Sequence, residues 1–435
     1  MQSRRRLVLF LFVVPTGHHE ASWRLPHSPA ERMYDVDYYV GLARAAELAG
    51  IDAVFFADAP ALRTRVEHNT GGSVLEPFTL LSALASVTTT LGLIGTASTT
   101  YAEPYNVARL VSSLDHLSRG RAGWNVVTTS FAGAAANFGA GAHPDRLTRY
   151  ARAEEFLQVV KGLWDSWASH AIRCDRAAGV YVDRSLIRPI DHDGEDFHVA
   201  GPFQSARSPQ GHPLIVQAGA SEPGRAFAAR HADVVFSVQR DRDRATRFRA
   251  GLRAAASAAG RRPEALLSLP GLSVHVASTA AEARNKQEEL DELVIPEHGI
   301  GQIRAVTGVD LSGFGLDEVI DHDALRDRHG PTAMTRADEI LAMVEEGPCT
   351  VRGLVRRVAG ARTHRVVVGP PEAVADTMET WFRSGACDGF NLLPPALPGG
   401  LHDFVEFVLP ELARRGIWRR SQGMLRERLE LPAVS

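Results

Sequence analysis

The chain alternates short, unbroken apolar runs with longer segments in which apolar residues recur every three or four positions. An unbroken run is typical of a strand buried on both faces, and the longer period is typical of an amphipathic helix. Eight runs predict strands, at residues 7–14, 53–57, 91–97, 124–127, 213–218, 234–238, 267–276 and 389–393. Helical patterns follow at residues 36–48, 77–87, 107–117, 151–167, 224–231, 244–259, 372–384 and 402–415.

This order of strands and helices predicts an α/β protein with one (β/α)8 barrel domain, a TIM barrel, over residues 1–435. Two excursions interrupt the rhythm, at about residues 169–212 and 293–364. The first is rich in Gly, Asp, His and Pro, so we expect loops and a hairpin there. We expect both excursions to extend from the carboxyl-terminal face of the barrel, where they would cover a pocket.

Polar side chains gather where the predicted strands end. They are His18 and His19 after the first strand, Asp58 after the second, Thr96 in the third, Asn125 in the fourth and Ser221 after the fifth. Any one of them could instead cap the helix that follows or brace the barrel. Together they predict a binding site on the face where the carboxyl ends of the strands meet.

Ser221 lies between a buried strand and the start of a helix, with Gly219 and Gly224 on either side. Free backbone N–H groups and the helix dipole favour an anion at such a position, and the hydroxyl adds a donor. A phosphate group is the ligand that this pattern indicates. The spacing supports equally well a Ser221 that acts only as a helix cap.

The adjacent residues His18 and His19 do not predict a metal site. Neighbouring strand residues point to opposite faces, so a pair of ligands normally needs one residue between them. The chain has no carboxylate-rich or His-x-x-x-His cluster to complete such a site, and we expect no metal. One packed and one solvated histidine is the simpler interpretation, unless a cofactor lies above this strand.

Composition narrows the class of protein. Among 435 residues, 45% are hydrophobic and 23% charged, with a net charge of -3, so neither nucleic acid nor an anionic membrane is an expected partner. Three widely spaced cysteines form no disulfide framework, which favours the reducing cytoplasm. Residues 4–6 are arginines that precede the first apolar run, as in a signal peptide. That run is too short to span a bilayer and no cleavage site follows, so a buried strand is favoured.

Long collinear motifs carry a resemblance to a known family. They are GHHEASWR at 17–24, EPFTLLSALASVTTTLGLIGTASTTYAEPYNVAR at 76–109, LDHLSRGRAGWNVVTT at 114–129, RYARAEEFLQVVKGLWDSW at 149–167, SPQGHPLIVQAGASEPGRAFAARHADVVF at 208–236 and VGPPEAVADTMETWFRSGACDGFNLLPP at 368–395. Through them nearly the whole chain resembles the nitrilotriacetate, dibenzothiophene-sulfone and pristinamycin-synthase branch of the bacterial-luciferase-like flavin monooxygenases.

The resemblance implies a luciferase-like barrel that takes reduced FMN from a separate NAD(P)H-dependent flavin reductase. Dioxygen then reacts through a peroxyflavin, and a small organic substrate is oxygenated, an activity that can include cleavage of a C–N or C–S bond. The family's flavin contacts fall on Asp58, Thr96, Tyr150 and Ser221, with Asn125 in one wall of the flavin pocket. The resemblance also implies a homodimer or homotetramer.

The chain departs from the family at two places. Members usually have His-x-x-Arg-Tyr where this chain has Arg146 four residues before Tyr150. We expect Arg146 to serve the phosphate, since arginine carries a permanent charge; the alternative is that His143 takes this part. The tail at residues 421–431 is shorter than usual, and we expect it to affect subunit contacts more than chemistry.

The resemblance leaves the proton chemistry and the substrate open. His19 or His18, at the end of the first strand, is the best candidate for a proton donor or a group that stabilises the peroxide. A lyase acting on riboflavin or another heterocycle, a flavin-binding protein without turnover and a deazaflavin-dependent oxidoreductase are the competing hypotheses. The substrate is not readable, because the excursions that would shape its pocket match the family least.

Overall fold

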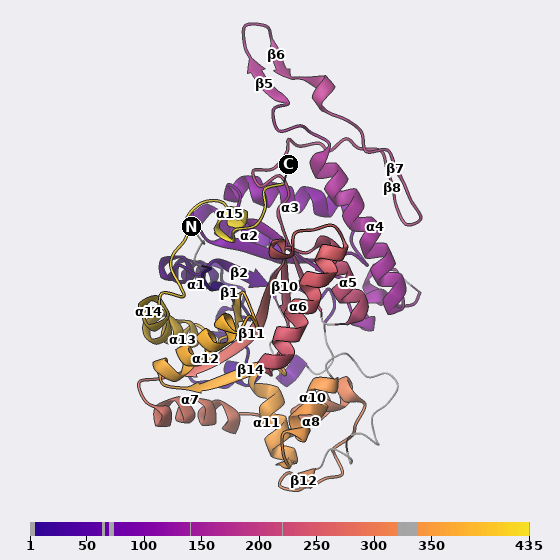
Figure 1. Cartoon of the computed structure of the whole chain (residues 1–435). Coiled ribbons are helices and arrows are strands. Elements are labelled where there is room, and N and C mark those ends of the chain that lie inside the picture. Colours follow the sequence, from indigo (N-terminus) through magenta and orange to yellow (C-terminus); the bar gives the residue numbers. More distant parts are fainter. Residues whose placement is uncertain are drawn as a thin grey trace.

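The computed structural model describes residues 5–62, 66–68, 74–139, 141–219, 221–320, 325 and 337–434. Within them eight parallel strands close into a barrel (Figure 1). In ring order they are β1 (Val8–Phe12), β2 (Ala53–Phe56), β3 (Gly92–Ser98), β4 (Ala122–Val127), β9 (Leu214–Ala218), β10 (Val234–Ser237), β11 (Leu267–Val276) and β15 (Gly389–Leu392). β1 pairs with β15, and β11 pairs with both β10 and β15, so the ring has no open edge. The predicted (β/α)8 fold and its eight strands are confirmed.

Helices surround the barrel (Figure 1). They are α1 (Val36–Ala49), α2 (Pro77–Val87), α3 (Pro104–Ser118), α4 (Arg146–Asp165), α5 (Glu222–His231), α6 (Arg242–Ala258) and α12 (Pro371–Arg383). The predicted helix at 402–415 forms as α13 (Gly399–Asp403), a π-helical stretch Phe404–Val408 and α14 (Leu409–Arg414). In the described part of the chain, no helix is both long enough and apolar enough to cross a membrane.

Apolar side chains fill the inside of the barrel. Phe10, Phe55, Ile94 and Leu269, from four different strands, belong to one buried cluster. Because side chains alternate along a strand, the residues two positions further on share this inward direction at the carboxyl end. Packed apolar side chains therefore fill the barrel interior. We expect the binding groups at the carboxyl ends of the strands.

The carboxyl-terminal tail closes the amino-terminal end of the barrel. Leu425, in α15 (Leu425–Arg428), and two later leucines of the tail belong to the same interior cluster; these are Leu429 and Leu431. Arg426 forms a bidentate ion pair with Asp233, the residue just before β10. Its Nη1 and Nη2 atoms lie 3.0 and 2.7 Å from the two carboxylate oxygens. The tail thus has a role inside its own chain that the sequence did not indicate.

The first excursion lies at the wrong end of the barrel to cover a carboxyl-face pocket. It forms two hairpins, β5 (Ile172–Asp175) with β6 (Val180–Val182) and β7 (His192–Asp193) with β8 (His198–Val199). It leaves the end of α4 and returns to the start of β9, and Figure 1 shows it at the end opposite α8 (Pro296–Thr307). The expected hairpin is present, but the expected position is wrong, because the carboxyl end of a barrel helix faces the amino ends of the strands.

The second excursion follows β11 and forms a helical layer at the carboxyl face. It contains α8, β12 (Val319–Ile320), α10 (Ala337–Glu345), β13 (Cys349–Thr350) and α11 (Val351–Ala361). The helix α7 (Ala280–Glu292), which the sequence pattern did not predict, comes just before it. α8, α10 and α11 share an apolar cluster of their own, which includes Ile303, Ile340 and Leu354. Parts of this excursion, residues 321–324 and 326–336, lie outside the described residues.

One strand of the barrel sheet was not predicted. β14 (Arg365–Gly369) pairs in parallel with the carboxyl half of β11, from Leu272 to Val276. The signal was weak, because only three valines stand between Arg365 and Gly369. β14 extends the barrel wall on the side where the second excursion returns.

Candidate active site at the carboxyl rim

Thr96 and Asn125 form a buried hydrogen-bonded pair on neighbouring strands. They are register partners of β3 and β4, and the Asn125 amide donates to the Thr96 hydroxyl oxygen at 2.9 Å. The Thr96 hydroxyl donates in turn to the carbonyl oxygen of Phe56 at 2.8 Å. The side-chain oxygen Oδ1 of Asn125 is buried without a hydrogen-bond partner among the described residues. The rim therefore presents an acceptor that a ligand could satisfy.

Tyr150, Ser221 and Gln217 surround a stretch of bare backbone at the start of α5. A Cβ atom added to Gly224 would lie 2.8 Å from the Tyr150 hydroxyl oxygen and 3.1 Å from the Ser221 hydroxyl oxygen. A Cβ atom added to Gly219 would lie 2.9 Å from the amide nitrogen of Gln217. These five residues are called the phosphate cradle below. The space needs glycine and is lined by hydrogen-bonding groups at a helix amino terminus, which fits a phosphate.

The cap and the anion-site interpretations of Ser221 are compatible. Its oxygen accepts a hydrogen bond from the backbone N–H of Gly224 at 3.3 Å, so it is the helix cap. The hydroxyl hydrogen stays available to donate to a bound anion. Gln217, which the sequence did not indicate, is buried beside it, and its side-chain oxygen has no hydrogen-bond partner among the described residues.

Arg146 and His143 differ in how available their side chains are to a bound phosphate. Arg146 is the first residue of α4 and is exposed, on the same face as Tyr150 one turn later. His143 is held on both sides: the Arg149 guanidinium donates to Nε2 at 2.7 Å, and Nδ1 lies 2.7 Å from the Tyr101 hydroxyl. Burial and the charge of Arg149 lower the pKa of His143. Arg146 is therefore the more available cation.

Asp58 lies beyond the end of β2, one strand from Thr96. It is half-buried, and burial raises the pKa of its carboxyl, with the nearby charge of Glu76 adding to the effect. Residues 63–65 and 69–73, further along the chain, lie outside the described residues. Asp58, Thr96, Asn125 and the cradle thus follow one arc of the rim, from β2 to β9.

His18 and His19 point to different surroundings. The ring of His18 packs edge-on against Phe12, at 4.6 Å between centroids, in the mouth of the barrel. His19 accepts at Nδ1 from the backbone N–H of Ala21 at 3.2 Å, so its proton is on Nε2, which lies 3.2 Å from the Asp291 carboxylate. Both ring nitrogens of His19 are therefore engaged.

His364 completes a row of rings over the barrel interior and was missed by the sequence reasoning. It stacks on Phe236 at 5.1 Å, and Phe236 packs edge-to-face on Phe12, which contacts His18. Gly271 makes room for it, because a Cβ atom there would collide with the His364 ring. The sequence contains one indication of this contact: Gly271 interrupts the buried apolar run of β11, and a glycine within a strand often marks a close approach by another group.

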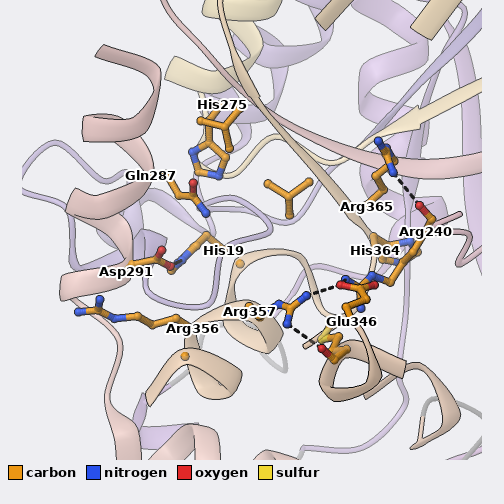
Figure 2. A pocket seen from close by; sticks show the side chains of 15 residues that line it. His19, Arg240, His275, Gln287, Asp291, Glu346, Arg356, Arg357, His364 and Arg365 are labelled. Atoms are coloured by element: carbon orange, nitrogen blue, oxygen red, sulfur yellow. Dashed lines mark hydrogen bonds and ion pairs between the residues drawn. The ribbon is translucent and has the colours of Figure 1, made fainter. Parts of the chain in front are cut away.

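A cavity of about 660 Å³ lies beside this row, between β11, β14, α7 and α11 (Figure 2). Of the predicted site residues, His19 lines it. Figure 2 shows His19, His275, Gln287 and Asp291 on one side, and His364, Arg240, Arg357, Arg365 and Glu346 on the other. Burial, with the charges of His19 and Lys286 adding to it, lowers the pKa of His275 to about 3, so this imidazole is neutral at ordinary pH. The cavity volume falls in the range of small-molecule sites.

Comparison with known proteins agrees with the fold. A family model described as luciferase-like monooxygenase matches residues 6–388. The chain is 42% identical over 418 residues to N-acetyl-S-(2-succino)cysteine monooxygenase of Bacillus subtilis (strain 168), covering 96% of this chain and 94% of that protein. It is 43% identical over 422 residues to nitrilotriacetate monooxygenase component A of Aminobacter aminovorans, covering 94% and 92%. The crystal structure of riboflavin lyase (RcaE) with modified FMN and substrate riboflavin has a TM-score of 0.86 and 33% identity, covering 98% and 95%.

Proposed function

The chain belongs to the luciferase-like monooxygenase family and is a flavin-dependent monooxygenase; from this premise we propose that it uses reduced FMN from a separate reductase to oxygenate a small organic substrate. Bound reduced flavin would supply two electrons, so that one atom of O₂ enters the substrate and the other leaves as water. The observation that carries the proposal is the phosphate cradle at the start of α5. Its side chains and bare backbone match the phosphate that distinguishes FMN from riboflavin.

Residues of one arc of the rim would hold the flavin. Ser221 and Tyr150 would bind the phosphate, and Arg146 would add a charge from the start of α4. Thr96 and Asn125, with the unpartnered Oδ1 of Asn125, would meet the ring edge or the ribityl chain, and Asp58 would meet it from β2. These residues would bind and orient the flavin. The helical layer at the carboxyl face would exclude water from the site.

A second protein would deliver the reduced flavin. One relative is named component A of its monooxygenase, which supports a partner for this chain as well. The chemistry needs a reductant, and an NAD(P)H-dependent flavin reductase is the simplest source. NAD(P)H is a cytoplasmic reductant, so we place both components in the cytoplasm. Self-association as a dimer or tetramer is part of the same proposal.

Labelled oxygen tests the proposed reaction. The full chain is mixed with reduced FMN, ¹⁸O₂ and either nitrilotriacetate or N-acetyl-S-(2-succino)cysteine, and products are followed by mass spectrometry. One ¹⁸O atom should appear in the oxidised product for each substrate consumed. Riboflavin is added in a third, separate reaction. Consumption of riboflavin there, with no label in the product of either acid, would favour the lyase alternative, which the similarity to riboflavin lyase supports. Tight FMN binding without turnover of any probe would favour a flavin-binding protein.

His18 is our choice of proton donor, because its ring packs against Phe12 in the mouth of the barrel. We expect His18→Ala to lower the yield of oxygenated product per FMN oxidised by about tenfold or more. Affinity for FMN should change by less than about twofold, since His18 is remote from the cradle. His19→Ala serves as the comparison. Full product yield in both variants would contradict a role for either histidine.

Arg146 should contribute to FMN binding through charge. We expect Arg146→Gln to raise the Kd of FMN by about threefold at low salt, because an exposed ion pair contributes modestly. The difference should vanish at high salt and should be absent for riboflavin. Kd is measured by quenching of flavin fluorescence. A loss of affinity in His143→Gln, with none in Arg146→Gln, would instead assign the phosphate to His143.

A further inference from the structure

We propose that Glu154 is a positioning residue of the proposed flavin site, which fixes α4 against α5 so that the Tyr150 hydroxyl lies over Gly224 in the phosphate cradle. The inference rests on the proposed function and adds to it a residue that would act without touching the flavin. Glu154 follows Tyr150 by one turn of α4, so both side chains lie on the same face of this helix. Figure 1 shows α4 and α5 side by side on the outside of the barrel.

Glu154 joins α4 to the last turn of α5 through two side chains. Its carboxylate accepts hydrogen bonds from Nε of Arg230 at 3.0 Å, from Nη2 of Arg230 at 2.9 Å and from Nε2 of His231 at 2.5 Å. Arg230 is exposed, whereas the side chain of His231 is mostly buried. Although burial opposes the charged form, the hydrogen bonds from His231 and Arg230 lower the pKa of Glu154 to about 2. The carboxylate is therefore charged at neutral pH.

Lys161 sets the direction of the buried hydrogen bonds. Its Nζ lies 3.1 Å from Nδ1 of His231. Burial lowers the pKa of Lys161 to about 8, so its ammonium is still charged at neutral pH. An ammonium can only donate, so Nδ1 of His231 accepts, and Nε2 carries the proton that is donated to Glu154. Burial also lowers the pKa of His231, in agreement with a neutral ring.

Phe227 links this end of α5 to Tyr150. Its buried ring packs against the His231 ring at 5.0 Å and against the Tyr150 ring at 5.9 Å between centroids. Tyr150 is therefore held from two directions, by α4, which Glu154 fixes, and by Phe227. Its hydroxyl oxygen lies 2.8 Å from the position that a Cβ atom of Gly224 would occupy. A hydrogen bond depends steeply on distance and angle, so a small shift of α4 would weaken the bond from Tyr150 to a phosphate in the cradle.

Binding of FMN and riboflavin to matched variants tests the role of Glu154. We expect Glu154→Ala to raise the Kd of FMN about fivefold, and Tyr150→Phe, which removes the hydroxyl itself, to raise it about tenfold. The double variant should bind FMN no more weakly than Tyr150→Phe alone, because Glu154 acts through that hydroxyl. Riboflavin, which lacks the phosphate, should bind every variant as it binds the unaltered chain. Kd is measured on the full chain by quenching of flavin fluorescence.

Glu155→Ala is the matched control. Glu155 is the next residue of α4 and pairs with His192 of the first excursion at 3.0 Å, so its loss should leave the Kd of FMN unchanged. Thermal unfolding shows whether each variant is folded. If Glu154→Ala is not folded, Glu154→Gln removes only the charge and should raise the Kd about threefold.

A folded Glu154 variant that binds FMN normally overturns the inference. An equal rise in Kd in the Tyr150→Phe background, or an equal rise for riboflavin, also overturns it, because the effect would not pass through the Tyr150 hydroxyl. In each of these results the unaltered chain still binds FMN, so the proposed function stands. Failure of the unaltered chain to bind FMN would instead overturn the proposed function itself.

Discussion

Replacing Ser221 by aspartate should abolish tight binding of FMN while the fold stays intact. The carboxylate would stand in the phosphate cradle, where the hydroxyl now has a hydrogen to donate. Repulsion between like charges at close range, added to the lost donor, amounts to about 3 kcal/mol or more, so we expect the Kd of FMN to rise at least about 100-fold. Aspartate is as good a helix cap as serine, so α5 keeps its start. Quenching of flavin fluorescence measures the change.

Two comparisons isolate the charge. Ser221→Asn keeps a capping side chain and a donor without the charge, and should weaken FMN binding by no more than about tenfold. Riboflavin, which lacks the phosphate, should bind Ser221→Asp and the unaltered protein alike. If Ser221→Asp bound FMN normally, the phosphate would lie elsewhere and the observation that carries the proposed function would be lost.

Removal of the tail from residue 422 onward should cost most of the stability of the barrel. Leu425, Leu429 and Leu431 would leave the interior cluster, and burying one leucine contributes about 2–5 kcal/mol relative to alanine. Asp233 would also lose Arg426 and remain a buried carboxylate without its principal partner. The total, about 9 kcal/mol or more, is comparable to the whole stability of a typical protein. Urea unfolding followed by circular dichroism measures it.

A shorter deletion is the matched control. Removing residues 432–435 leaves all three leucines in place and should move the urea midpoint little. Leu429→Ala should lie between the two, with a loss of about 3 kcal/mol. If the long deletion unfolded at the same urea concentration as the unaltered chain, the tail would not be part of the core, and an effect on subunit contacts would become the better account of it.

Much of the fold was predictable because it is written in local patterns. Buried strands appear as unbroken apolar runs, and all eight barrel strands form near their predicted positions. The exceptions have physical reasons. β14 is too short and its valines are flanked by Arg365 and Gly369, so its strand character depends on pairing with β11. The first excursion follows a helix, α4, and therefore leaves from the end of the barrel opposite the carboxyl rim. The composition of the excursion itself gives no information about that position.

The candidate site divides in the same way. Ser221, Thr96 and Asn125 were predicted as site residues because polar residues at strand ends stand out in the sequence. Gln217 and His364 were missed, because residues distant in the chain surround them. Tyr150 and α5 lie beside Gln217, and Phe236 and Gly271 lie beside His364.

The sequence by itself determined the fold class, the family and the arc of rim residues on β2, β3, β4 and β9, because each depends on neighbours along the chain. The tertiary structure alone decided how the tail closes the amino-terminal end of the barrel, the ring row that joins His18 to His364 and the set of residues that lines the cavity. Arg240 follows β10, whereas Arg357 and Arg365 come from α11 and β14 more than one hundred residues later. Residues separated by that distance along the chain line one cavity only because folding brings β10, α11 and β14 together.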